Sequence, residues 1–159
     1  MVDNSFDSTF DPTMSQNLRY ITKDDLVSVI QDRFIDESSA NIAGDNSILF
    51  DIESKAIEYV ISYITGRYKT DLIFSETAPL ASGILKQIIA QIVVYRAVKR
   101  NAARKVPEDY VTLMSDATKQ LERIQSGAMS LVAMPLQTDD SGETTPVLFG
   151  NTTNENKFI

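Results

Sequence analysis

The amino-acid sequence predicts an all-α fold: a four-helix bundle-like domain with a short β-hairpin and extended N- and C-terminal tails. Apolar residues recur at three- and four-residue spacing in four stretches, which is the period of an amphipathic helix. Residues typical of helix starts and ends bound these stretches. The two ends of the chain are polar and bury too little apolar surface to fold alone. We therefore divide the chain into an N-terminal extension 1–19, a helical domain 20–136 and a C-terminal tail 137–159.

The first two predicted helices lie in the N-terminal half of the domain. Thr22, with Asp25 three residues later, resembles a capping box, and the apolar pattern after it predicts a helix over 22–35. A loop rich in Ser, Gly and Asn follows. Asp51 is the expected cap of the second helix, which ends near Gly66 because glycine favours the C-terminal end of a helix.

The third and longest helix is expected over 79–101. Its apolar residues cover more than one face, which is typical of a central helix buried by its neighbours. The fourth helix is expected between Pro107, which the first turn tolerates, and the stop at Gly127. After it, 130–136 and 147–149 are predicted as two short strands joined by a turn near 139–142.

The composition excludes most catalytic chemistry, because the chain contains neither Cys nor His. Without them there is no thiol nucleophile, no Ser-His triad and no zinc site built on thiolate or imidazole. No phosphate-binding glycine motif is present. Adjacent carboxylates occur at predicted helix starts and in loops, where capping and solvated charge account for them: 24–25, 36–37, 108–109 and 139–140. We expect no enzyme activity, no metal and no cofactor.

The chain is acidic, with 22 Asp and Glu against 15 Lys and Arg and a net charge of −7. Most of the excess acid lies in the two tails. Because phosphate contacts need Lys and Arg, this balance disfavours nucleic-acid binding. Met1 is not followed by a basic start and an apolar stretch, so we expect no signal peptide. The longest apolar stretch, 84–98, is interrupted by polar residues and falls short of the length that spans a membrane. We expect no membrane partner.

A basic cluster near the end of the third predicted helix is one candidate interaction site. Two interpretations stay open. The cations suit a solvated helix C-terminus, or they form a patch for DNA or an acidic partner surface, including the acidic tails of this chain or of a neighbouring copy. The candidates are Arg96, Lys99, Arg100, Arg104 and Lys105.

Isolated apolar residues in the polar tails are a second set of candidates. An aromatic-acid pair occurs twice, four residues apart, as Phe6-Asp7 and Phe10-Asp11. Such residues either reflect chance composition or anchor a segment that folds on a partner, and we favour the second interpretation. The docking candidates are Phe6, Phe10, Val147, Leu148, Phe149, Phe158 and Ile159. The tyrosines at 59, 63, 68, 95 and 110 have helical spacing and are expected at the core or its edge, not on a stacking platform.

Short motifs within 20–136 follow one another in a consistent order. Tyr20-Ile21-Thr22 opens the domain, and Gly66-Arg67-Tyr68 ends the second predicted helix. The third predicted helix opens at 79–80, and the fourth lies within 107–127. On these residues the domain resembles the head–tail connector proteins of tailed phages, also called head-completion or adaptor proteins, in the Mu-like small connector group. The chain departs from the family pattern in two places. Family members usually begin near the position of Tyr20, so the first nineteen residues are an addition, and they usually have Leu-Pro-Leu after the position of Tyr68, which this chain lacks. Roles for the tails therefore do not carry over.

The resemblance implies a ring, usually of twelve copies, that sits beneath the portal protein and presents a surface to the next tail component. Such a ring extends the DNA channel, and the genome passes without sequence-specific binding. It implies a location in the virion after synthesis in the host cytoplasm. In such a ring we expect the basic cluster to face a neighbouring subunit or the portal. The residues alone leave two rivals: a cytosolic helical adaptor that works as a monomer or dimer, and an enzyme using carboxylates or Ser and Thr.

Overall fold

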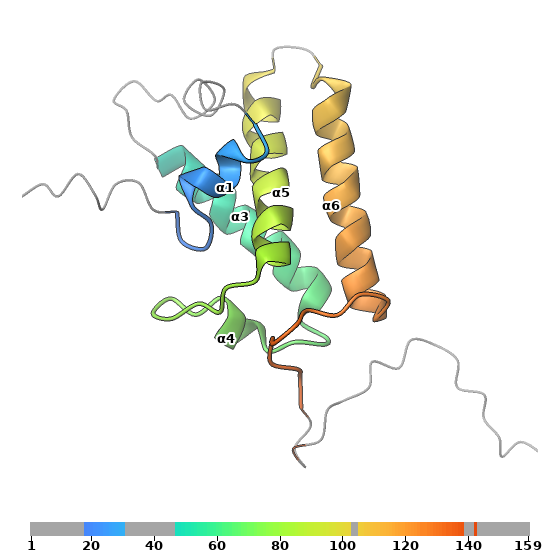
Figure 1. The fold of residues 1–159 in the computed structure, drawn as a ribbon. Coiled ribbons are helices and arrows are strands. Elements are labelled where there is room, and N and C mark those ends of the chain that lie inside the picture. Colours follow the sequence, from blue (N-terminus) through green and yellow to red (C-terminus); the bar gives the residue numbers. More distant parts are fainter. Residues whose placement is uncertain (1–17, 31–46, 103–104, 139–141, 143–159) are drawn as a thin grey trace, which may run out of the picture.

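The computed structural model describes residues 18–30, 47–102, 105–138 and 142. Its helices are α1 (Lys23–Val27), α3 (Ser47–Ile64), α4 (Thr70–Ile73), α5 (Gly83–Asn101) and α6 (Glu108–Ser126). Helix α5 contacts α1, α3 and α6, and it runs in the opposite direction to α3 and α6 (Figure 1). No sheet forms among the described residues. The prediction of an all-α fold is confirmed.

Helix α5 is the centre of the core, as its apolar pattern predicts. Ile88, Ile89 and Ile92 are fully buried. The helix begins at Gly83, not near residue 79, so the predicted start is wrong by about one turn. The reason is that Ser82 caps the helix by accepting from the Leu85 amide. The preceding backbone instead bonds outside the helix, with the Leu80 amide donating to the Ile73 carbonyl.

The first two helices also differ from their predicted bounds. The capping box of Thr22 and Asp25 is present, but α1 ends at Val27, and 31–35 lie outside the described residues. Helix α3 begins at Ser47, so the expected cap at Asp51 is wrong. Asp51 lies one turn inside the helix, where its carboxylate pairs with Lys55 at 2.7 Å. An i, i+4 ion pair of this kind stabilises an exposed helix face.

Two features outside the long helices were not predicted correctly. The one-turn helix α4 was missed, because only its packing, with Ile73 and the following Phe74 buried, distinguishes it from a loop. The strand predicted over 130–136 does not form. Leu136 makes an isolated antiparallel bridge with Tyr68, and the Gln137 amide donates to the Arg67 carbonyl at 2.8 Å. The other predicted strand, 147–149, lies outside the described residues.

A buried carboxylate joins the start of the domain to α3. The side chain of Glu53 is only 1% exposed. It accepts from the backbone N–H groups of three consecutive residues, 19 to 21, at 2.7, 2.8 and 3.0 Å. Beside it, the Tyr20 hydroxyl donates to the Leu80 carbonyl at 2.8 Å. These contacts hold the backbone of residues 19–21, just before α1, against α3.

The turn after α6 contains a strained residue, Ala133, with φ at 60°. The left-handed conformation costs an L-residue about 1–2 kcal/mol, whereas glycine adopts it freely at an entropic cost of about 0.5–1 kcal/mol. We expect Ala133→Gly to raise the free energy of unfolding by up to about 1 kcal/mol in urea titrations followed by circular dichroism. Ala128→Gly, at an exposed position without positive φ, is the control. An equal decrease in the free energy of unfolding of both variants would show that Ala133 is not strained.

Candidate functional site

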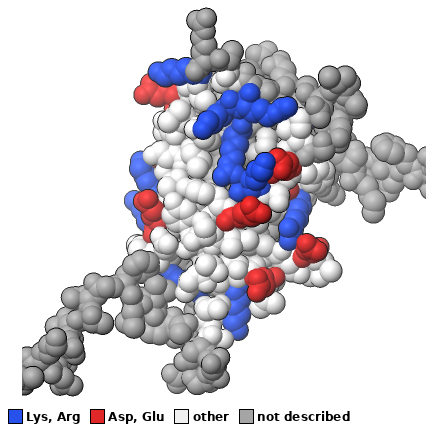
Figure 2. Space-filling view, turned by 180° about the vertical axis from the view of Figure 1, so that it is seen from behind, with Lys and Arg blue, Asp and Glu red and all other residues white. Residues whose placement is uncertain are grey.

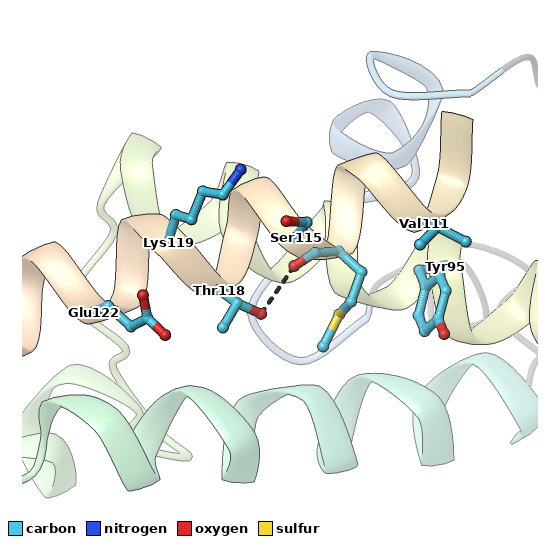
Figure 3. Close-up of a pocket in the computed structure, with 7 residues that line it drawn as sticks. Tyr95, Val111, Ser115, Thr118, Lys119 and Glu122 are labelled. Atoms are coloured by element: carbon cyan, nitrogen blue, oxygen red, sulfur yellow. Dashed lines mark hydrogen bonds between the residues drawn. The ribbon is translucent and has the colours of Figure 1, made fainter. Parts of the chain in front are cut away.

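A hollow of about 440 Å³ runs along one face of α6, with Tyr95 of α5 at one end (Figure 3). We call it the α6 groove. The α6 residues recur at three- and four-residue spacing, which places them on one side of the helix. Val111 is 46% exposed and is the most open apolar side chain of the groove. The lining residues are Tyr95, Val111, Met114, Ser115, Thr118, Lys119 and Glu122.

Tyr59 of α3 reaches the groove residue Thr118, and Tyr63 lies beside Tyr59. The Tyr59 hydroxyl lies 3.1 Å from the Tyr63 hydroxyl and 3.4 Å from Thr118 Oγ1 on α6. The two rings meet edge to face at 5.2 Å. Tyr59, Tyr63 and Tyr110 are partly buried against the core, and Tyr68 is fully buried. The prediction that these four tyrosines pack at the core or its edge is confirmed, and Tyr95 lines the groove instead.

The neighbours of Tyr63 perturb its acidity. Its hydrogen bond to Tyr59, then burial, then the negative charges that Tyr59 and Glu122 carry, raise the pKa of Tyr63 to about 12. A tyrosine in the unfolded chain titrates near pH 10. Between pH 10 and about 12 the Tyr63 hydroxyl keeps its proton in the folded state but loses it in the unfolded state. The contribution of protonated Tyr63 to the free energy of unfolding is therefore complete below pH 10 and is lost as the pH rises to about 12.

We therefore expect an ultraviolet titration of the folded protein to contain two late tyrosine steps. One belongs to Tyr63 and the other to Tyr20, whose pKa is raised by burial. Tyr63→Phe removes the first of them, and Tyr59→Phe moves it to lower pH because the main cause of the shift is gone. Tyr110→Phe is the control and leaves both late steps in place. A Tyr63→Phe titration identical to that of the wild type would refute the assignment.

The basic cluster lies at the C-terminal end of α5, beside the groove. The Arg96 guanidinium lies 5.6 Å from the centre of the Tyr59 ring, and the Lys99 ammonium 5.7 Å from that of Tyr95. Arg100 and Lys105 are exposed, and Arg104 lies outside the described residues. Lys and Arg side chains gather on the upper part of the face in Figure 2, the end at which α5 finishes in Figure 1. Whether this cluster contacts a partner stays a prediction.

The Gly66-Arg67-Tyr68 motif has a structural position, joining the ends of α3 and α6. Arg67 Nη1 donates to the Ile124 carbonyl in the last turn of α6 at 2.7 Å. The Tyr68 hydroxyl accepts from the Leu131 amide at 2.8 Å in a buried position. The left-handed Gly127, with φ at 86°, ends α6 as predicted.

The remaining predicted candidates either lie outside the described residues or have a local role at a helix start. The docking candidates at 6, 10, 147–149, 158 and 159 lie outside the described residues, as do the carboxylate pairs 36–37 and 139–140. Asp25 completes the capping box, and Glu108 and Asp109 occupy the first turn of α6. Over the described part of the chain, no three His, Cys, Asp or Glu side chains gather closely enough for a metal ion. No helix in that part is long and apolar enough to cross a bilayer.

The described residues differ in charge from the whole chain. They contain twelve Lys and Arg against eleven Asp and Glu, whereas the chain has 15 and 22. The helical part is therefore close to neutral with a slight positive excess. The negative charge of the protein belongs to the segments outside the described ranges, with a net charge of −3 in 1–17, −3 in 31–46 and −3 in 139–141 and 143–159 together. A basic helix end beside a groove thus occurs in a chain whose remaining segments are acidic.

Fold and surface together define an all-helical module that offers a groove and a basic helix end. Residues 20–147 match the family model described as Bacteriophage Mu, Gp36, and the chain belongs to this family. It is therefore a phage protein. The match includes the Gly66-Arg67-Tyr68 motif and the whole α6 groove, and it leaves 1–19 outside. No curated protein sequence matches the chain.

Proposed function

We propose that this chain is a head–tail connector: a structural virion protein that forms a ring, of twelve copies, between the portal and the tail and extends the DNA channel. The observation that carries the proposal is the family match over residues 20–147. The proposal concerns assembly, with no catalytic step, no cofactor and no sequence-specific contact to DNA.

The described surface supports a ring in two ways. A ring is built from heterologous contacts, in which one face of a subunit meets a different face of its neighbour. The α6 groove with its basic end provides a face of mixed apolar and positive character. The segments outside the described ranges carry the opposite, negative charge on the same chain. In this arrangement the basic cluster faces a neighbouring subunit or the portal.

The test is to locate the chain in purified particles of the phage that encodes it. Mass spectrometry of intact virions measures copies per particle, and cryo-electron microscopy of the portal vertex shows their position. We expect about twelve copies in a ring beneath the portal. Absence from mature particles would overturn the proposal, and a cytosolic helical adaptor that uses the groove would replace it.

A further inference from the structure

The α6 groove and the N-terminal segment of the chain have complementary chemistry. We propose that the groove of one copy binds residues 1–17 of a second copy, with Phe6 and Phe10 against the apolar part of the groove and Asp7 and Asp11 beside Arg96 and Lys99. The family match begins at residue 20, so it does not account for this segment. The contact gives the N-terminal extension a function that family membership leaves unassigned.

The end of the groove at Tyr95 is suited to aromatic and acidic side chains, whereas Glu122 lies at the other end (Figure 3). The groove is an open surface hollow of about 440 Å³, not an enclosed cavity. Val111, Met114 and the ring of Tyr95 provide its apolar part. Lys99 lies over Tyr95, and Arg96 lies over Tyr59 beside it. Among the described residues, neither cation forms an ion pair with a carboxylate, so both charges remain available for acidic groups from outside.

The segment 1–17 has the matching composition. It contains three Asp, no Lys and no Arg, and its two phenylalanines are each followed directly by an aspartate. Phe6 and Phe10 are four residues apart, so one helical turn would present both on the same face. Helices that bind in grooves use anchors at this spacing. The other outer segments fit less well, because 31–46 and 143–159 each contain a basic residue and neither repeats the aromatic-acid pair.

The fold favours binding between copies. Helix α1, which the segment precedes, lies on one side of α5, and α6 lies on the other (Figure 1). Within one copy the segment would have to pass around the bundle before it reached the groove. A neighbouring copy can present its groove directly. Such a contact is heterologous, because a segment meets a groove, and it can therefore repeat around a ring.

This inference deepens the proposed function, since a ring would use the contact at every interface, but it is measured on the isolated protein. Absence of the chain from virions would refute the connector and leave the peptide measurement below unaffected. Conversely, a groove that does not bind the segment would refute only this inference. The two failures are therefore distinguishable.

The first experiment measures binding of a labelled synthetic peptide of residues 1–17 by fluorescence anisotropy. The acceptor is the full chain with Phe6→Ser and Phe10→Ser, whose own segment cannot compete. We expect saturable binding that weakens as salt is added, because the charged partners are exposed. Adding Val111→Glu to the acceptor should weaken binding about tenfold or more, since it places a carboxylate in the groove.

Matched controls separate the groove from general effects. Val132→Glu adds the same charge at a position that is 84% exposed and outside the groove, and it should leave binding unchanged. A peptide with Phe6 and Phe10 replaced by Ser should not bind. Circular dichroism checks that each acceptor is folded. Equal binding to the Val111→Glu and Val132→Glu acceptors would overturn the proposal.

The second experiment tests whether the contact joins two copies, using sedimentation velocity over a range of concentrations. The wild type should form higher species, and each variant alone, Phe6→Ser/Phe10→Ser or Val111→Glu, should remain monomeric. A mixture of the two variants should form one-to-one dimers, because one supplies the groove and the other the segment. A wild type that stays monomeric while the peptide binds only the segment variant would place the segment in its own groove and overturn the proposed contact between copies.

Discussion

Replacing Glu53 by alanine is expected to lower the free energy of unfolding by about 3–5 kcal/mol, because an unsatisfied buried donor costs about 1–3 kcal/mol and three donors lose their acceptor. The carboxylate is 1% exposed and accepts from the N–H groups of residues 19 to 21. Those residues include Tyr20, whose hydroxyl holds the chain before α5 through Leu80. Loss of Glu53 therefore releases the start of the domain from two helices together.

The size of this effect can be checked by urea titration of three variants. Glu53→Gln keeps one carbonyl oxygen as an acceptor for these N–H groups but turns its amide NH₂ toward one of them. It should therefore lower the free energy of unfolding by about 1–3 kcal/mol, less than Glu53→Ala. Glu58→Gln, an exposed glutamate on the same helix, should change stability by less than about 0.5 kcal/mol. A Glu53→Ala variant no less stable than Glu58→Gln would show that the carboxylate does not anchor the segment.

Glu53 also shows why sequence reasoning recovered the helices but not what joins them. Helix α3 is visible in the sequence because its apolar residues repeat within the helix itself. A signal for Glu53 was present, since it lies four residues after Leu49 and four before Ile57, within the apolar stripe. Its donors, however, are 32 to 34 residues away in the sequence. No local pattern predicts which backbone groups will reach it.

Some predicted helix bounds were wrong for the same reason, because contacts with distant residues set them. Glycine and proline marked the ends of α6 correctly because a left-handed Gly127 is a local requirement. The start of α5 depends instead on Leu80 bonding to the end of α4, and α4 itself was not predicted. Asp51 resembled a cap, but the helix begins one turn earlier, at Ser47. Start positions set by contacts between elements are not accessible to a pattern within one element.

The candidate site was predicted only in part. The spacing of Arg96 and Lys99 indicated a shared helix face, and both side chains do lie over tyrosine rings beside the groove. The groove itself was missed, because Val111 lies outside the apolar stripe of its helix and Tyr59 reaches it from α3. A groove between two helices, with a third helix beside it, becomes visible only once their packing is known.

Removal of Arg67 is the other change for which we expect a large effect. Its guanidinium donates to the Ile124 carbonyl at 2.7 Å, where the last turn of α6 has unpaired carbonyl groups and a negative partial charge. It also packs on Gly127, where an added Cβ would lie 3.1 Å from Arg67 Nη1. Hydrogen bonds to a charged group contribute about 1.5–3 kcal/mol, so Arg67→Ala should lose about that much stability.

The loss should be concentrated at the end of the domain. The backbone of Arg67 and the hydroxyl of Tyr68 hold residues 131–137 against the end of α3, and the guanidinium fixes that end to α6. Hydrogen exchange should therefore show faster exchange of the Leu131 amide in Arg67→Ala than in the wild type, beyond the global loss of stability. Arg123→Ala is the control, because it removes an exposed arginine from the same helix end and should cost only about 0.3–1 kcal/mol. If the two arginine variants match in stability and in exchange at Leu131, the motif residue Arg67 contributes only charge, and what joins α3 to α6 must be sought in the buried ring of Tyr68.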